Sequence, residues 1–204
     1  MGLDVEIKRG RKFDQVIEGA RQVFMADGFE GASVDDIAKA AQVSKATLYS
    51  YFPDKRLLFV EVAKQECQRQ AQLAVEQVHM KGSLNEVLFN AASTMARFFM
   101  SKLGRQTYRM AVAESERFPE VGRAFYAGGP TIARNALLDY LREQMATGAL
   151  VIEDVDLAAD QFIELCKAQH HVQSLLGLKT DWSDAEIDHI IRGAVETFLA
   201  RYSA

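Results

Sequence analysis

The residues best suited to recognise another molecule lie in one short run without acidic side chains, residues 45–51. At helical spacing, Lys45, Ala46 and Tyr49 share the outer side of this run. A lysine ammonium donates to the acceptors of guanine, and an alanine or the edge of a tyrosine ring packs on the methyl group of thymine. This combination favours a helix that reads base edges in the major groove of DNA.

The neighbouring sequence predicts the elements that present this run. Residues 33–56 have the pattern of a short capped helix, a tight turn and a second short helix that stops at Pro53. In the second helix, Leu48 and Phe52 are four residues apart and are expected to anchor it in a core. The pattern is typical of a helix-turn-helix.

Polar residues around the expected base contacts are suited to phosphate oxygens instead. Helix N-termini, hydroxyls and ammonium groups all bind phosphate, and such contacts fix position rather than sequence. Lys55 is expected to make one of them, because it begins the next helix. The other contacts expected around the recognition helix are Ser33, Ser44, Thr47, Ser50 and Tyr51.

Charge is distributed unevenly along the chain. The 204 residues have a formal net charge of -4, which argues against a nucleic-acid partner only if the charge is uniform. Residues 1–56 hold nine basic and nine acidic side chains, whereas the remainder holds 15 and 19. A basic arm near the N-terminus is either a disordered tail or a contact to phosphates or the minor groove. Its members are Lys8, Arg9, Arg11 and Lys12.

Helical periodicity extends over the whole sequence, so the expected fold class is all-α with about nine to ten helices. The three prolines, Pro53, Pro119 and Pro130, each lie where a helical pattern is interrupted. Capping boxes that begin at Ser83 and Ser183 mark the starts of two helices. Later helices are expected at about 105–115, 118–127, 130–147, 154–176 and 183–202.

At the helix-turn-helix the sequence resembles the TetR family of transcriptional regulators. The family typically reads close to D-I-A-x-A-A-G-V-S-x-x-x-L-Y-x-Y-F-x-x-K-x-x-L, and this chain has DIAKAAQVSKATLYSYFPDKRLL from Asp36 onwards. The resemblance covers about residues 10–60. Gln42 stands where the family usually has glycine, so this residue must adopt a backbone conformation that glycine takes freely.

A second resemblance covers the later part of the chain. The segments FPEVGRAFYAGGPTIARNALLDYLREQMATGAL and DLAADQFIEL look like the C-terminal domain of the AefR-like subgroup of these regulators. The two resemblances imply a DNA-binding domain over residues 1–55 and an effector-binding and dimerisation domain over residues 56–204. They also imply a repressor that a small molecule releases from its operator.

Large apolar side chains of the second domain are candidates for an effector pocket. Such cavities are walled by aromatic rings and flexible thioethers, with a few polar anchors. For each residue taken alone, a place in the core is an equal or better interpretation, so only the set is informative. The candidates are Met95, Phe98, Phe99, Met110, Phe125, Tyr126, Tyr140, Phe162 and Cys166.

The last two helices carry apolar residues over more than one narrow face, which predicts two burial partners. One side is expected to face the core and the other a second subunit. The alternative is a helix pair enclosed within a monomer. The residues expected at the subunit interface are Phe162, Val172, Leu176, Ile187, Ile191, Val195 and Phe198.

Other function classes have little support in the sequence. It has no G-x-S-x-G, glycine-rich dinucleotide turn or H-E-x-x-H motif, so an enzyme is not expected. Cys166 and His170 share a helical face but need a third ligand from elsewhere, and no metal or other cofactor is expected. The remaining rival is a helical ligand-binding or scaffold module whose helix-turn-helix contacts protein.

The expected partners are double-stranded operator DNA, a second copy of the chain and a small, largely apolar effector. No apolar run approaches the roughly 18 residues of a membrane helix, and the first 30 residues mix charged with apolar positions. No membrane partner is therefore expected, and the sequence favours a cytoplasmic protein.

Overall fold

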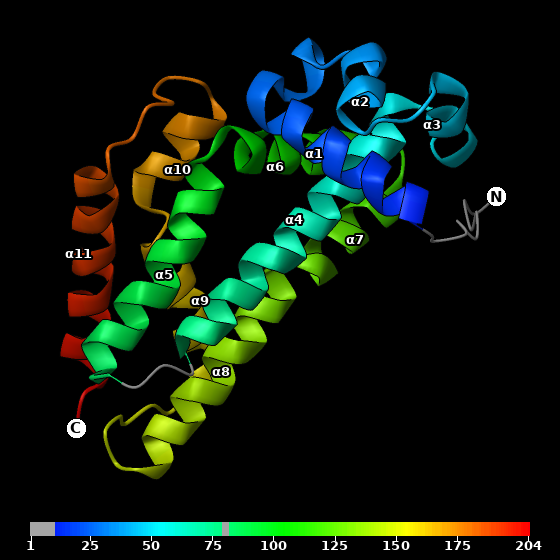
Figure 1. The fold of residues 1–204 in the computed structure, drawn as a ribbon. Helices are drawn as coiled ribbons and strands as arrows, with labels where there is room; N and C mark the ends of the chain where they lie inside the picture. Colours follow the sequence, from blue (N-terminus) through cyan, green and yellow to red (C-terminus); the bar gives the residue numbers. More distant parts are fainter. Residues whose placement is uncertain (1–10, 79–81) are drawn as a thin grey trace. The chain divides into compact units, whose positions relative to one another are not determined.

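Serine caps and apolar spacing divide the chain into helices, which Figure 1 shows for the computed structural model. The structure describes residues 11–78 and 82–204. Within these ranges it has eleven helices and no strand, with one isolated bridge between Leu150 and Ser203. The expected all-α class is confirmed. The helices are α1 (Arg11–Gly31), α2 (Val34–Ala40), α3 (Lys45–Tyr51), α4 (Lys55–Val78), α5 (Leu84–Met100), α6 (Lys102–Ser115), α7 (Pro119–Gly128), α8 (Pro130–Ala146), α9 (Val155–Leu165), α10 (Ala168–Leu175) and α11 (Asp184–Tyr202).

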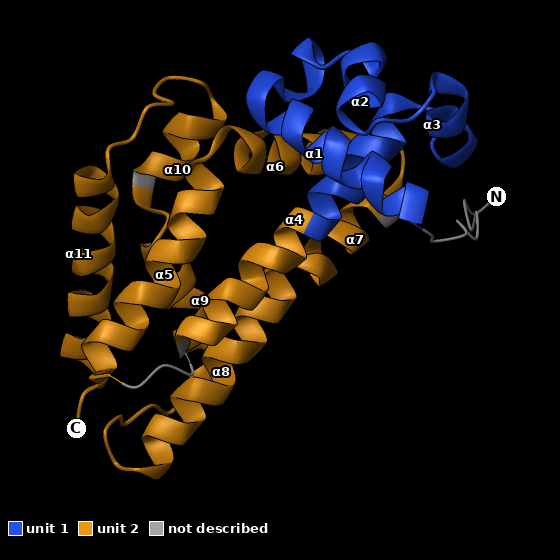
Figure 2. Cartoon of the chain, viewed as in Figure 1, with its two compact units in different colours: residues 1–65 blue, residues 66–204 orange. Residues whose placement is uncertain are grey.

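The chain divides into two units, Met1–Gln65 and Glu66–Ala204, which Figure 2 colours separately. The division falls inside α4, whereas the sequence placed it at residues 55–56, where this helix begins. Unit 1 contains α1 to α3 and the first part of α4. Unit 2 contains the rest of α4 and all later helices.

Aromatic rings form much of the core of unit 1. Phe13 packs on Phe52 with ring centroids 5.6 Å apart, and Phe24 packs edge-on against Phe59 at 5.0 Å. Helices α1 and α2 lie in close contact with each other. A Cβ atom added at Gly19 of α1 would lie only 2.4 Å from the backbone nitrogen of Ala41, so this approach requires a residue without a side chain.

The turn between α2 and α3 contains Gln42 in the left-handed region, with φ of 54°. This is the conformation that the sequence required where the family usually has glycine. The Gln42 amide donates to the Lys39 carbonyl at 3.1 Å, and the Val43 amide donates to the Ala38 carbonyl at 3.0 Å. These two bonds hold the turn in spite of the unfavourable φ.

The core of unit 2 is built chiefly from α5, α8, α9 and α11. Helices α5 and α11 run side by side, and α8 lies against α9 (Figure 1). Both expected capping boxes are present, at Ser83 before α5 and at Ser183 before α11. The buried core side chains include Leu88, Leu138, Leu141, Ala158, Phe162, Ile191, Val195 and Phe198.

The helix expected at 154–176 is not continuous, and this prediction is wrong. Helix α9 ends at Leu165 and α10 begins at Ala168, whose φ is 38°. No glycine or proline lies at this break, so local sequence gave no signal for it. The break raises the number of helices above the nine to ten expected.

Among the described residues, no helix is both long enough and apolar enough to cross a membrane. The longest helix, α4, has 24 residues, but charged side chains recur along it, among them Lys64, Glu66 and Arg69. Helix α4 therefore lacks a long apolar run, and it joins the two units along the chain.

Replacement of Gln42 by glycine should stabilise the protein. Glycine removes the steric cost of the left-handed conformation, and part of this gain is offset by the greater freedom of glycine in the unfolded chain. We expect Gln42→Gly to raise the free energy of unfolding by about 0.5 to 1 kcal/mol, measured by urea denaturation. The control Gln68→Gly, inside α4, should lower it by a similar amount. A destabilising Gln42→Gly would contradict the assigned backbone strain.

Candidate DNA-binding surface and effector cavity

Helix α3 presents the expected recognition face to solvent. Leu48 is 1% exposed and Phe52 is 2% exposed, so both predicted anchors are buried. Lys45, Ala46 and Tyr49 are exposed, and Tyr49 retains 48% of its accessible surface. The geometry therefore leaves the expected base-reading side chains accessible to a partner.

Hydroxyl groups brace the recognition helix from within. The Ser44 hydroxyl caps α3 by accepting from the Thr47 amide at 3.1 Å, and the Ser44 and Thr47 hydroxyls are 2.9 Å apart. Ser50 donates to the Thr47 carbonyl at 2.6 Å. These bonds fix the helix start. A phosphate oxygen only accepts hydrogen bonds, so Ser50 must turn its hydroxyl away from the Thr47 carbonyl to donate to one.

Two of the residues expected to contact phosphate also have structural partners. The half-buried Tyr51 ring packs edge-on against Phe13, with centroids 5.8 Å apart. Ser33 caps α2, and its hydroxyl accepts from the Asp36 amide at 3.0 Å. Both residues therefore help to position the helix-turn-helix, whatever else they contact.

An acidic residue from α2 lies beside the acid-free helix. Asp35 forms an ion pair with Lys45, and the two side chains remain 64% and 58% exposed. Such exposed pairs contribute little to stability and exchange readily. Lys45 must therefore leave Asp35 when it meets an acceptor on DNA.

Lys55 does not have the free ammonium that the sequence suggested. Its Nζ donates to the carbonyls of Phe29 and Ala32, at 2.8 and 3.0 Å, and lies 4.5 Å from the centroid of the Phe29 ring. The expectation of a phosphate contact through this ammonium is corrected, because two of its three donors are used within unit 1. Lys55 ties the start of α4 to the segment after the kink at Gly28.

The basic arm is described only in part. Lys8 and Arg9 lie outside the described residues, whereas Arg11 and Lys12 are exposed in the first turn of α1. Their positions leave both earlier interpretations of the arm open to experiment.

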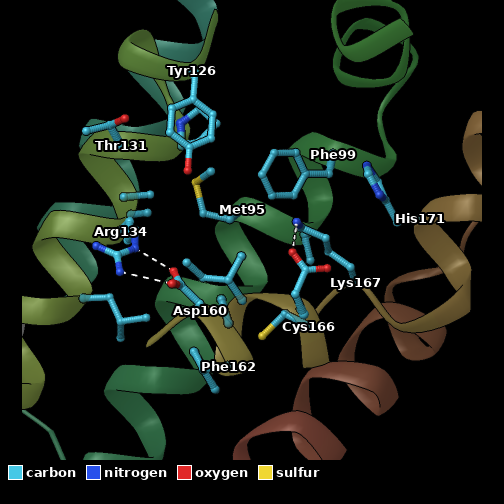
Figure 3. A pocket seen from close by; sticks show the side chains of 18 of the residues that line it. Met95, Phe99, Tyr126, Thr131, Arg134, Asp160, Phe162, Cys166, Lys167 and His171 are labelled. Atoms are coloured by element: carbon cyan, nitrogen blue, oxygen red, sulfur yellow. Dashed lines mark hydrogen bonds and ion pairs between the residues drawn. The ribbon is translucent and has the colours of Figure 1, made fainter. Parts of the chain in front are cut away.

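Unit 2 contains a cavity of about 750 Å³, which is within the size range of small-molecule sites. Figure 3 shows it from close by. Six of the nine expected pocket residues line it: Met95, Phe99, Phe125, Tyr126, Phe162 and Cys166. The other three, Phe98, Met110 and Tyr140, are not in its lining, and Phe98 and Tyr140 are buried elsewhere in the unit.

Every charged residue in the cavity lining has a partner of opposite charge. The guanidinium of Arg134, on α8, donates to Asp160 of α9 at 2.6 Å (Figure 3). It also donates to Asp156 of α9 at 3.0 Å. Lys167 donates to Glu164 at 2.5 Å. The hydrogen bonds between Arg134 and Asp160 lower the pKa of Asp160 and raise the pKa of Arg134, so this pair stays ionised.

An imidazole from α10 lies at one end of the cavity, close to Phe99 in Figure 3. The His171 ring packs edge-on against Tyr108 at 5.1 Å and against Phe99 at 6.0 Å. Burial lowers the pKa of His171, so the ring is neutral at physiological pH. Burial also raises the pKa of the nearby Cys166 thiol to about 12, which keeps this thiol protonated.

Two family models match the sequence. The model described as AefR-like transcriptional repressor, C-terminal domain, matches residues 86–204, more than half of the chain. The model described as bacterial regulatory proteins, tetR family, matches residues 16–62. The chain belongs to the TetR family. Both resemblances noted in the sequence are thereby confirmed.

Relatives and solved structures agree with this family. The flavonoid-responsive regulator FrrA is 34% identical, with 96% of this chain and 98% of that chain covered and a TM-score of 0.66. A TetR-family regulator from Mesorhizobium loti shares the fold, at 24% identity over 95% of this chain and 98% of that chain, with a TM-score of 0.82.

The curated relatives match over a short stretch of the chain. The HTH-type transcriptional repressor AcnR of Corynebacterium glutamicum is 34% identical over 62 residues, which are 30% of this chain and 33% of that protein. The match therefore spans about a third of that relative, and the relative's activity is not transferred by this similarity alone.

In this TetR-family chain, most of the expected interface residues are core residues, and that assignment needs correction. Phe162, Ile187, Ile191, Val195 and Phe198 are at most 5% exposed and pack in the core of unit 2. The breadth of the apolar stripe reflects the packing of α5 and α9 against α11. Only Val172 and Leu176 of the expected set are exposed, at 54% and 68%.

Sequence patterns gave no indication of the polar residues that line the cavity. Tyr108, Arg134, Lys167 and His171 line it, yet none belongs to a spacing motif. Only the packing of α6, α8, α9 and α10 brings them together. A histidine on a mixed helix gives no sign, in sequence alone, that its ring faces a cavity.

Loss of the Lys55 ammonium should destabilise unit 1. Lys55→Met keeps the apolar stem but leaves the Phe29 and Ala32 carbonyls without this donor and removes the cation from the Phe29 ring. We expect the free energy of unfolding to fall by about 2 kcal/mol, measured by urea denaturation followed by circular dichroism. Lys39→Met, at an exposed position on α2, should change it by less than about 0.5 kcal/mol. Equal stability of the two variants would restore the phosphate-contact interpretation of Lys55.

Proposed function

We propose that the protein is a homodimeric DNA-binding regulator that represses transcription from an operator and is released by a small, largely apolar effector. The observation that carries this proposal is the accessible face of α3, held outward by the buried Leu48 and Phe52. AcnR, which is 34% identical over 62 residues, is named as a transcriptional repressor, and this supports the proposal. The same proposal places the protein in the cytoplasm, where operator DNA is accessible, and gives it no catalytic role.

The proposed DNA contacts divide by chemistry. Lys45, Ala46 and Tyr49 read bases, because they are exposed on the outer face of α3. Ser44, Thr47 and Ser50 lie at the start or flank of this helix. Their hydroxyl groups donate to phosphate oxygens, and these contacts fix the position of the helix on the duplex. Two α3 helices of a dimer would then enter successive major grooves, about 34 to 36 Å apart.

The proposed dimer surface lies on α9 and α10 together with α11. Exposed residues recur every three or four positions on α9 and α10, and four of them are large and apolar. Exposed apolar residues in such a row mark an interaction surface. The row consists of Leu157, Gln161, Leu165, Ala168, Val172 and Leu176.

The exposed face of α11 offers a complementary surface. Small side chains recur along it, and Gly193 has open space around its Cα. Small residues allow helices to approach closely. A partner's apolar row on α9 and α10 would fit against this face, whose small members are Ala185, Gly193, Thr197 and Ala200.

Helix α4 provides a covalent link between the proposed DNA surface and the cavity. Its first residue, Lys55, is bonded within unit 1, and its last turns supply Ala74 and Val75 to the cavity lining. An effector that binds better to the conformation with poor operator spacing must weaken operator binding, by thermodynamic coupling. FrrA is a flavonoid-responsive regulator by name, which supports an aromatic, largely apolar effector for this chain.

Tyr49 should be required for operator preference. Tyr49→Ala removes a base contact without opening the core, so we expect about 1 to 3 kcal/mol less discrimination between operator and random duplex. The operator is first located by footprinting on DNA beside the gene, and affinities are then measured by fluorescence anisotropy over a salt series. Val151→Ala, at an exposed apolar position of unit 2 outside the cavity lining, should leave discrimination unchanged. A protein without salt-dependent DNA binding would favour the scaffold interpretation instead.

A charge within the apolar row should separate the subunits. Val172→Glu places a carboxylate in the proposed interface twice, once from each copy, and we expect the dimer dissociation constant to rise at least about tenfold. Sedimentation equilibrium measures this constant. The matched control is Val151→Glu, at a position 65% exposed outside the row, and it should leave the constant unchanged. If both variants remain dimers of equal strength, the interface lies elsewhere.

A further inference from the structure

The charges around the cavity are balanced within the protein. Its lining contains two cations, Arg134 and Lys167, and two anions, Asp160 and Glu164, and each cation is bonded to one of these anions. Asp156, the second partner of Arg134, lies 3.8 Å from Arg142. Among the described lining residues, therefore, no charged group is left to neutralise an ionised ligand.

The polar groups that remain available in the lining are neutral. Among the described residues, no hydrogen bond from the side chains of Tyr108, Tyr126, Thr131 or Asn135 occurs within the protein, and all four line the cavity. His171 belongs with them: it is 8% exposed and lines the cavity, and its ring packs on neighbouring rings but forms no hydrogen bond with another described residue. Its neutral ring offers one donor and one acceptor.

The apolar part of the lining favours flat rings. Phe99, Tyr108 and Phe125 come from three different helices, and their contacts with one another and with His171 are edge-on. Edge-on clusters of this kind present ring faces and edges on which a further aromatic ring packs well. The cavity of about 750 Å³ has room for a ligand of several rings.

We propose that the cavity selects an uncharged aromatic ligand that carries a hydroxyl group, and that His171 forms a hydrogen bond with this group. The inference rests on the proposed function of this cavity as the effector site. It adds the chemical class of the effector and a residue that determines specificity. An ionised carboxylate or ammonium would have to be buried without a counter-ion, which is costly, or to displace a charged residue from one of the two lining ion pairs, whereas an uncharged ligand does neither.

The test uses four probes of one shape: flavone, flavone with a single phenolic hydroxyl, and the same skeleton with a carboxylate or an aminomethyl group in place of that hydroxyl. Calorimetric titration of the DNA-free, full-length protein at about pH 7 keeps the phenol largely protonated. We expect the hydroxyl probe to bind about tenfold more tightly than flavone, as one buried hydrogen bond allows. Both ionised probes should bind more weakly than flavone.

Two variants separate the parts of the proposal. His171→Phe keeps the aromatic packing and removes the hydrogen bond, so the hydroxyl probe should bind no better than flavone. The control His189→Phe, at an exposed position of α11, should behave like the unchanged protein. Glu164→Gln leaves Lys167 without its partner, and because the Glu164 side chain is 70% exposed, the fold should tolerate it. This variant should gain affinity for the carboxylate probe several-fold.

The outcomes are decisive in each direction. Tightest binding by an ionised probe, or equal binding of all four, would overturn the charge argument. Binding of the hydroxyl probe that persists in His171→Phe would overturn the role of His171. Absence of binding by every probe would overturn the proposed ligand class. Operator affinity, measured separately without any probe, reports on the proposed DNA-binding function, so the two failures are distinguishable.

Discussion

The burial of Leu48 and Phe52 is the constraint on which the DNA-binding surface depends. Phe52 packs against Phe13 of α1, and both anchors are almost inaccessible to solvent. Because these side chains are four residues apart, their burial fixes the rotation of α3 about its axis. The accessible sides of Lys45 and Tyr49 then follow from helical geometry, and the Lys55 ammonium fixes where the next helix starts.

The sequence predicted best where local rules determine the structure. Short-range patterns predicted the two buried anchors, the left-handed conformation of residue 42, and the helix caps at Ser33, Ser44, Ser83 and Ser183. It failed where tertiary packing decides. The break before Ala168 has no local signal. The broad apolar stripe of α11 suggested a subunit interface, but it packs mostly in the core. The Lys55 ammonium donates to carbonyls 23 and 26 residues earlier in the chain, which local sequence does not predict.

Ion pairs have opposite roles in the two units. The pair between Asp35 and Lys45 is highly exposed, so it holds the lysine in place at little energetic gain and releases it to a stronger partner. Arg134 is less exposed and is held by two carboxylates of the neighbouring helix. The two carboxylates compete with an incoming anion for this guanidinium, so the cavity is a poor host for a charged ligand, and the same ion pairs tie α8 to α9.

The wall of the cavity is also part of the proposed dimer-forming region, which gives the effector a short route to the subunit arrangement. Phe162 lines the cavity and packs on Phe198 of α11 at 5.1 Å, and Phe198 packs on Tyr202 at 4.9 Å. The Tyr202 hydroxyl donates to Gln161 at 3.1 Å, so α9 and α11 are joined beside the cavity. A ligand that displaces Phe162 must move these two helices together, because a close-packed core has no spare volume to absorb the shift. In the proposed dimer, the outer faces of the same helices carry the contacts to the second subunit, so such a movement would change the distance between the two recognition helices.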